Sequence, residues 1–258
     1  MFGIFIIILI ACLFIYFIFK PYTSYEFFQD VQNNPSIKKG AILMYCTQNI
    51  IDNWAHYSIF INQKYANKQG YDFILIKNPY DSTCTHAWQK IPAMLNLLNQ
   101  DYRFVMYIDA DAIINIHNIS VETILDKYKG DVIVCSDKGN SNGKYAVNGG
   151  MVIVRNTENS RKLLNKWWEL RHKYNEFAYE QWALSDLVRN KYPDIDGSII
   201  SIAPETEFNS LYSEILQYLN DFANNPETIP PNRFVLHFMS TTDETRKNIL
   251  AKLYSRFS

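Results

Sequence analysis

Short apolar runs alternate with longer stretches of mixed polarity along most of the chain. The runs predict buried strands at residues 41–46, 72–76, 104–108, 131–135, 151–154, 198–202 and 234–238. Apolar residues at helical spacing between them predict helices at 53–68, 86–98, 120–128, 157–174 and 179–190. Strands that alternate with helices are typical of a largely parallel sheet covered on both faces, so the expected fold class is α/β.

In a sheet of this kind, ligands bind beyond the carboxyl ends of the strands. The residues just after Cys46, Ile108 and Leu236 are therefore the first candidates for a functional site. No internal repeat or low-complexity stretch interrupts the pattern, so a single domain is expected.

The last segment of the chain predicts an amphipathic helix. Thr241 and Glu244 have the spacing of a capping box, in which two side chains satisfy free backbone groups at a helix start. This helix could lie on a membrane surface, but we favour docking against the domain. The apolar residues that share one of its faces are Ile249, Leu250, Leu253, Tyr254 and Phe257.

The amino-terminal run from Met1 to Phe19 contains no charged residue. As a helix it would be about 28 Å long, enough for the hydrocarbon core of a bilayer. A cleaved signal peptide needs a basic start and a small-residue cleavage site, and the run offers neither. We therefore predict a transmembrane anchor at 1–20, a short stem at 21–39 and one domain at 40–258, in a single-pass membrane protein.

The side of the membrane that carries the domain stays open. Lys20, Lys38 and Lys39 follow the apolar run, and only the α-amino group precedes it. The positive-inside rule would keep the domain cytoplasmic, whereas a Golgi-type lumenal domain requires this weak bias to be overridden.

Composition excludes several classes of protein. Hydrophobic residues make up 48% of the chain and charged residues 20%, which provides a core and excludes intrinsic disorder. Lysine and arginine number 25 against 26 aspartates and glutamates, so a basic surface for nucleic acid is not expected. The four cysteines form no C-x-x-C pattern, so neither a structural zinc site nor a disulfide framework is implied.

Two carboxylates follow directly on the apolar run at 104–108. Asp109 and Asp111 are separated by Ala110, so an extended chain would point both to the same side. Two like charges held together need a counter-cation, or one of them must bind a proton. Mn²⁺ and Mg²⁺ prefer oxygen ligands and suit such a pair. The alternative is a turn with two solvated aspartates, and the apolar residues on either side argue against it.

Two further segments carry candidate side chains. Asn148, Gly149 and Gly150 precede a predicted strand, where paired glycines either allow the close approach of a ligand or form a simple bulge. Glu180 and Gln181 open a predicted helix, where a carboxylate also suits the helix dipole.

A lysine and a histidine complete the candidates. Lys90 could reach a diphosphate, although an isolated lysine is more often solvated surface. His237 lies in the apolar run at 234–238, where a lone histidine is more often a hydrogen-bonded core residue than a metal ligand.

These segments follow one another in an order that resembles glycosyltransferase family 34. That family contains fungal galactosyl- and mannosyltransferases and plant xylosyltransferases. The matching segments are Tyr65 to Asp72, Trp88-x-Lys90-Ile-Pro92, Tyr107-Ile-Asp109-Ala-Asp111-Ala112, Asn148-Gly-Gly150 with Arg155-Asn156, Leu163-Leu164-x-x-Trp167-Trp168, Glu180-Gln181 with Leu184, and His237-Phe238. The resemblance covers about residues 40 to 240.

The resemblance implies a GT-A domain, a Rossmann-like and mostly parallel sheet, behind one amino-terminal span. It implies a Mn²⁺-dependent (or Mg²⁺-dependent) enzyme that moves a hexose or pentose from a UDP- or GDP-sugar to a glycan with retention of anomeric configuration. Asp109, Asp111 and His237 would bind the metal, and Gln181 or Glu180 would face the reacting sugar. Contacts to the donor would come from Thr47, Asp72, Lys90, Asp109, Asn148, Gly149 and Gly150.

The chain departs from the family near its carboxyl end. Met239, Ser240 and Thr241 stand where the family has small residues and a cysteine. A basic residue expected shortly afterwards is absent, and Thr242 lies near its place. Tyr179 stands where a second acidic residue often precedes the acidic residue and the glutamine. One expected contact to the diphosphate is therefore left without a residue.

Two rival functions remain. A metal-dependent nucleotidyl- or phosphotransferase also needs paired carboxylates, but the phosphate loop G-x-x-x-x-G-K is absent from the sequence. An inactive, membrane-anchored carbohydrate-binding protein would be expected to have lost one carboxylate of the pair, and both are present. The sequence predicts neither the donor sugar and base nor the acceptor and linkage.

Overall fold

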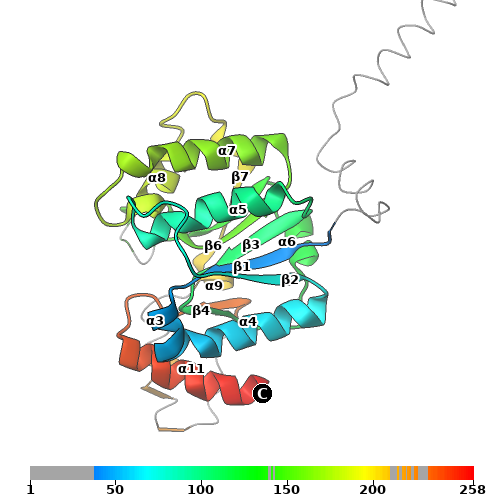
Figure 1. Cartoon of the computed structure of the whole chain (residues 1–258), viewed down its shortest axis with the longest axis vertical. Helices are drawn as coiled ribbons and strands as arrows, with labels where there is room; N and C mark the ends of the chain where they lie inside the picture. The colour runs from blue at the N-terminus through cyan, green and yellow to red at the C-terminus, as the bar shows by residue number, and fades with distance from the viewer. Residues whose placement is uncertain are drawn as a thin grey trace, which may run out of the picture. The chain divides into compact units, whose positions relative to one another are not determined.

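A six-stranded sheet forms the centre of the computed structural model, with its strands in the order β2-β1-β3-β6-β5-β7 (Figure 1). β1 pairs in parallel with β2 and β3, and β5 pairs in parallel with β7. β6 runs antiparallel to both of its neighbours, β3 and β5. The predicted mostly parallel α/β sheet is confirmed. The strands are β1 (Ala41–Tyr45), β2 (Asp72–Ile76), β3 (Phe104–Ile108), β5 (Val132–Ser136), β6 (Val147–Arg155) and β7 (Ile200–Ala203).

The structure describes residues 38–138, 141, 143–209, 214, 217–218, 220–221, 224–225 and 232–258. The predicted anchor at 1–20 and all but the last two residues of the predicted stem lie outside these ranges. Within the described part of the chain, no helix is long and apolar enough to cross a membrane. The anchor and the single-pass arrangement therefore stay predictions.

Helices cover both faces of the sheet (Figure 1). The helices α5 (Lys90–Leu98), α7 (Glu158–Glu169) and α8 (Tyr179–Val188) lie over one face. On the other face lie α4 (His56–Gln69) and α11 (Asp243–Phe257). The shorter helical elements are α3 (Gln48–Ile50), η1 (Ile51–Ala55), η2 (His86–Gln89), α6 (Val121–Lys127), η3 (Leu170–His172), η4 (Gly197–Ile199) and α9 (Glu205–Phe208).

Two apolar cores form because successive residues of a strand point to opposite faces of the sheet. Leu43 of β1 joins the core beneath α5, α7 and α8, together with Trp88 and Trp167. Ile61 of α4 and Leu250 of α11 belong to the second core, on the opposite face. The central strands β1 and β3 are thus buried on both sides, which explains why they are apolar throughout.

Two of the predicted helices begin with irregular turns. The helix predicted at 53–68 starts with a π-helical turn, η1, and ends at Gly70. The φ of Gly70 is 72°, a left-handed cap that glycine adopts without steric cost. The helix predicted at 86–98 opens with the 3-10 turn η2, so that Lys90 is the first residue of α5.

β6 is longer than the strand predicted at 151–154. Asn148, Gly149 and Gly150 lie inside this strand and not before it, which corrects the prediction. Glycine is unfavourable in a strand interior, so the sequence pattern predicted that the strand begins only at Met151. The strand extends because Asn148 and Val147 pair with β5 beyond a shift in register. Gly149 and Gly150 lie at this shift, so neither is paired with a residue of β5. Side chains of the site bind the backbone of Gly149, and the N–H of Asp109 binds the carbonyl of Gly150.

A separate two-stranded sheet was not predicted. It consists of β4 (Ala112–Ile114) and β8 (Val235–His237), which pair antiparallel with Ala112 opposite His237. A turn separates β4 from β3, and in it the N–H of Ala112 donates to the carbonyl of Asp109 over 3.0 Å. The small sheet therefore brings His237 next to Asp111, although the two residues are 126 positions apart.

The carboxyl-terminal helix, α11, docks against the domain. Its cap is Thr242, whose hydroxyl accepts a hydrogen bond from the N–H of Thr245, and not Thr241 as predicted. Thr241 instead donates its hydroxyl to the carbonyl of Phe238. Because α11 packs on α4 and η1, its apolar face is not free to lie on a membrane surface. The buried residues of this face are Ile249, Leu250 and Leu253.

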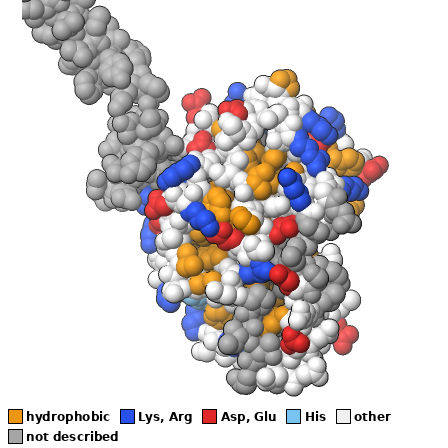
Figure 2. Space-filling view, turned by 180° about the vertical axis from the view of Figure 1, so that it is seen from behind, with side chains coloured by type: hydrophobic (Ala, Val, Ile, Leu, Met, Phe, Trp, Pro, Cys, Tyr) orange, Lys and Arg blue, Asp and Glu red, His pale blue; other side chains and the backbone are white. Residues whose placement is uncertain are grey.

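Figure 2 shows basic and acidic side chains interspersed over one face of the molecule. The described part of this face presents no continuous basic surface. This arrangement agrees with the net charge of −1 and with the expectation that nucleic acid is not the ligand.

Candidate active site

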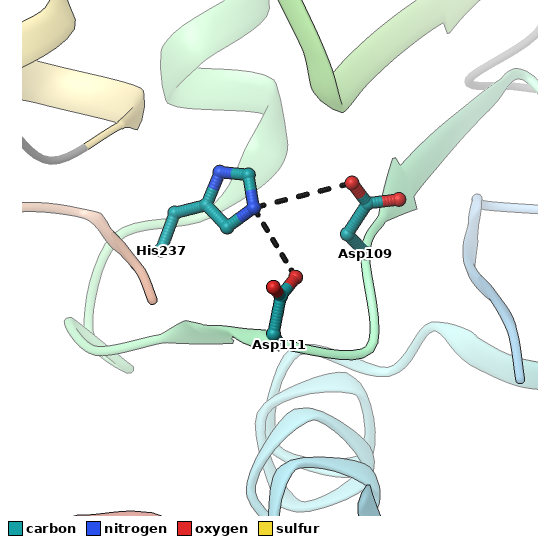
Figure 3. Close-up of side chains that lie close together, drawn as sticks. All are labelled: Asp109, Asp111 and His237. Carbon is teal, nitrogen blue, oxygen red and sulfur yellow. Dashed lines mark hydrogen bonds and ion pairs between the residues drawn. The ribbon is translucent and has the colours of Figure 1, made fainter. Parts of the chain in front are cut away.

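Three metal-binding side chains converge at the carboxyl end of β3. Asp109 and Asp111 come from the turn between β3 and β4, and His237 is the last residue of β8 (Figure 3). Ligand atoms of the three residues all lie within 4.8 Å of one another. Nε2 of His237 is 3.2 Å from Oδ1 of Asp111 and 3.9 Å from Oδ2 of Asp109.

The convergence of the aspartates has a different cause from the one predicted. We expected an extended chain that points Asp109 and Asp111 to the same side, and the structure shows a turn. The turn is not solvated, because the side chains of Asp109 and Asp111 are only 30% and 17% exposed. The backbone of the turn is fixed by a 2.8 Å hydrogen bond from the N–H of Asp109 to the carbonyl of Gly150.

The donor set fits a hard divalent cation. Two carboxylates and one imidazole are ligands that Mn²⁺ accepts, and Mg²⁺ favours the oxygens. Nδ1 of His237 lies 3.1 Å from Oδ1 of Asn209, which leaves Nε2 facing the two aspartates. A hydrogen bond of this kind orients a metal-binding imidazole. No sequence pattern pointed to Asn209, which simply follows the short helix α9.

The charges of this cluster are coupled. Burial would raise the pKa of Asp111, but His237 and then Arg246 oppose it and lower this pKa to about 2. Burial would lower the pKa of His237, but the charge of Asp111 and the hydrogen bond to it raise this pKa above its ordinary value. His237 and Asp111 thus stabilise each other's charged forms, and a metal that binds at Nε2 competes with a proton for that nitrogen.

Arg246, in the first turn of α11, adds a cation that the sequence did not suggest. Its Nη2 lies 3.0 Å from Oδ2 of Asp111, and its Nη1 lies 3.2 Å from Oδ1 of Asp243. The contact depends on the docking of α11, which places a residue from the end of the chain beside the turn after β3. A basic side chain therefore does reach the site, from a position beyond Thr242.

Lys90, which we predicted could reach a diphosphate, is enclosed by the protein. Its side chain is 2% exposed, and Nζ donates to the carbonyl of Gly149 (2.8 Å) and to Oε1 of Glu180 (2.9 Å). Nζ also lies 3.4 Å from Oδ1 of Asp109 and over the ring of Tyr107. Although burial disfavours its charge, Asp109 and Glu180 raise the pKa of Lys90. The charge of Lys90 is therefore neutralised by two carboxylates of the site, those of Asp109 and Glu180.

Gln181 is fixed by two hydrogen bonds. Its Oε1 accepts from the N–H of Gly149 (3.2 Å), and its Nε2 donates to Oδ2 of Asp137 (3.1 Å). The other carboxylate oxygen of Asp137 lies 3.4 Å from Nδ2 of Asn148. Asp137 was not among the predicted residues, although it directly follows β5. The rule that marked residues after a strand would have found it.

The two glycines of β6 allow the parts of the site to approach one another. A Cβ atom at Gly150 would lie 2.4 Å from Cε1 of His237 and 2.8 Å from Oδ2 of Asp109. A Cβ atom at Gly149 would lie 3.1 Å from Oε1 of Glu180. A side chain at position 150 would therefore enter the predicted metal site itself.

The remaining two predicted donor contacts lie at opposite edges of the sheet. Thr47 lies two residues after the end of β1, at the N-cap position of α3, and so at the carboxyl edge of the sheet. Asp72 is the first residue of β2 and pairs with Ala41, which places it at the amino edge. It lies about 13 Å along the strand from the carboxyl end, and its carboxylate accepts from the hydroxyl of Tyr102. The structure thus places Asp72 away from the edge that carries the candidate metal ligands, and its contact with the donor stays a prediction.

A protein family and two solved structures link this chain to glycosyltransferases. A model of the nucleotide-diphospho-sugar transferase family matches residues 48–248. A glycosyltransferase involved in glycosylation of the major capsid of PBCV-1 is 16% identical, with a TM-score of 0.62 over 83% of this chain and 98% of that one. The glycosyltransferase GlyE of Streptococcus pneumoniae TIGR4 is 15% identical, with a TM-score of 0.52 over 85% of this chain and 62% of that one. No curated protein matches the chain in sequence.

At these identities the structural likeness establishes the fold. The predicted GT-A fold of glycosyltransferases is confirmed, whereas membership of family 34 stays a prediction.

We expect Gly150→Ala to disrupt the candidate metal site. The new methyl group must displace His237 or Asp109, which costs about 1–3 kcal/mol for an overpacked buried position. Calorimetric titration with Mn²⁺ should therefore show affinity at least about tenfold weaker than that of the parent. Gly149→Ala is the control in the same strand, since its methyl group meets Glu180 and not a predicted ligand. Equal Mn²⁺ affinity in parent and Gly150→Ala would contradict the assignment.

Proposed function

Because the chain belongs to the nucleotide-diphospho-sugar transferase family, we propose that it is a metal-dependent, retaining glycosyltransferase similar to family 34. It moves a hexose or pentose from a UDP- or GDP-sugar to a glycan acceptor. The observation that carries the proposal is the group of Asp109, Asp111 and His237 at the carboxyl edge of the sheet. With the predicted anchor at 1–20, the enzyme is a single-pass membrane protein.

Asp109, Asp111 and His237 bind the metal, Mn²⁺ or Mg²⁺, in this proposal. Such an ion acts as a Lewis acid and stabilises the negative charge that develops on a departing nucleoside diphosphate. Oδ1 of Asp109 is occupied by the hydroxyl of Tyr107 and by Lys90, so Oδ2 is the oxygen that faces His237. The carboxylate is therefore oriented before any ligand arrives.

Gln181 and Glu180 are the candidates that face the reacting sugar. Departure of the diphosphate leaves positive charge on the sugar, and a nearby carbonyl or carboxylate oxygen stabilises it. Gly149 and Asp137 hold the amide of Gln181, and Lys90 holds the carboxylate of Glu180. For front-face attack, the acceptor hydroxyl gives its proton to the leaving phosphate oxygen, so no protein base is needed.

The comparisons favour this function over its rivals. The matched family transfers nucleotide-linked sugars, which argues against a nucleotidyl- or phosphotransferase. The intact set of carboxylates argues against an inactive carbohydrate-binding protein.

A panel of UDP- and GDP-sugars tests the proposal. We expect the full-length protein, in detergent, to release nucleoside diphosphate from one of them with Mn²⁺ and not with EDTA. Asp111→Asn should lower this rate at least about a hundredfold, or 2.7 kcal/mol. Asparagine has nearly the same size as aspartate but lacks the negative charge of the metal ligand. Asp126→Asn, at an exposed aspartate, is the matched control and should behave as the parent. Release from no donor, or full activity of Asp111→Asn, would contradict the proposal.

The role of Gln181 makes a separate prediction. Gln181→Ala should lower kcat by about a hundredfold, or 2.7 kcal/mol, and leave the affinities for Mn²⁺ and donor close to those of the parent. This pattern marks an interaction that forms mainly in the transition state. Gln100→Ala, at an exposed glutamine, is the control. If Gln181→Ala weakens donor binding as much as it slows turnover, Gln181 is a ground-state contact and its proposed role is wrong.

A further inference from the structure

Among the residues predicted to contact the donor, no basic side chain is free to bind the diphosphate. A nucleoside diphosphate carries several negative charges, and the site already contains the carboxylates of Asp109, Asp111, Glu180 and Asp137. Lys90 is enclosed by Glu180, Asp109 and the carbonyl of Gly149, with 2% of its side chain exposed. Its charge cannot serve the diphosphate unless these bonds break, and breaking a buried pair is costly.

Arg246 reaches the same cluster from the opposite side. Its Nη2 lies 3.0 Å from Oδ2 of Asp111, the oxygen that does not contact His237. Its guanidinium carbon lies 5.4 Å from the ring of Trp54 in η1, the element that follows Thr47 and α3. Arg246 thus lies between the candidate metal ligands and the helical segment that follows β1.

The guanidinium of Arg246 has hydrogen-bonding capacity to spare. Nη1 and Nη2 each contact one carboxylate, of Asp243 and Asp111 respectively. Nε is buried and has no hydrogen-bond partner among the described residues. Nε is closed off from solvent, so a ligand would be bound by the second N–H of Nη1 and of Nη2, in a side chain that is 19% exposed.

We propose that Arg246 binds the diphosphate of the nucleotide sugar. This inference rests on the proposed function. A phosphate oxygen that shared an ion with Asp111 would lie within a few ångströms of its carboxylate, and Arg246 is already within hydrogen-bond distance of that carboxylate. The planar guanidinium can donate two hydrogen bonds to a phosphate while it contacts Asp111. The carboxyl-terminal helix α11 is then part of the donor site.

The alternative role, in which Arg246 only positions Asp111, predicts the opposite response to the metal. If the arginine positions a ligand, its removal weakens Mn²⁺ binding. If it serves the diphosphate, its removal takes a positive charge away from the metal site and leaves Mn²⁺ affinity unchanged or higher. The two roles are therefore separated by titrating the metal and the nucleotide independently.

The substitution should leave the fold intact. α11 is held by the buried residues Ile249, Leu250 and Leu253, and its cap at Thr242 does not involve Arg246. The next residue, Lys247, is exposed and provides a matched control for the loss of one positive charge from the same helix.

The experiment compares full-length parent, Arg246→Ala, Arg246→Lys and Lys247→Ala by calorimetry, first with Mn²⁺ alone and then with UDP and GDP at saturating Mn²⁺. We expect Arg246→Ala to bind Mn²⁺ as well as the parent and the preferred nucleoside diphosphate about tenfold to a hundredfold more weakly. The affinity of Arg246→Lys for the diphosphate should lie between those of the parent and Arg246→Ala. A lysine keeps the positive charge but cannot donate the two parallel hydrogen bonds of a guanidinium. Lys247→Ala should match the parent.

Two results would overturn the inference. One is weaker Mn²⁺ binding with unchanged diphosphate binding in Arg246→Ala, and the other is parent-like diphosphate binding in both arginine variants. If Arg246→Ala does not fold, Arg246→Lys decides between the outcomes in the same titrations. A parent that binds Mn²⁺ and neither UDP nor GDP contradicts the proposed function itself, and this inference fails with it.

Discussion

Repulsion between Asp109 and Asp111 is the constraint around which the site is built. A tight turn after β3 holds both carboxylates in a mostly buried position, where their charges cannot be solvated fully. Each is balanced by a different part of the chain: Lys90 contacts Asp109, whereas His237 and Arg246 contact Asp111. One oxygen of Asp109 stays directed at the imidazole, and the space between them suits a divalent ion.

The fold supplies these counter-charges through three unrelated contacts. β8 pairs with β4 and brings His237, α11 docks on α4 and η1 and brings Arg246, and α5 begins at Lys90 above β3. β6 closes the arrangement, because its glycines leave room for the imidazole and for the pair of Lys90 with Glu180. The glycines of β6 are therefore part of the site as well as of the central sheet.

Much of this could be predicted from the sequence, because the strands are short, apolar and followed directly by their functional residues. Asp109, Asp111 and His237 were found in that way. Arg246 and Asn209 were not, because helix docking and tertiary contact place them, and no local pattern records either. Lys90 was assigned the wrong environment, since a single lysine in a sequence does not reveal that two carboxylates will enclose it. The place of Asp72 at the amino end of β2 was not foreseen, because the matched segment does not indicate at which end of the strand it lies.

The central claim is that Asp109, Asp111 and His237 bind one divalent ion. Pulsed electron paramagnetic resonance of Mn²⁺ bound to the full-length protein tests it most directly, since a coordinated imidazole nitrogen couples to the electron spin. We predict one Mn²⁺ for each chain with a ¹⁴N coupling typical of direct coordination, and loss of that coupling in His237→Gln. Bound Mn²⁺ without such a coupling, or a coupling that persists in His237→Gln, would contradict the account.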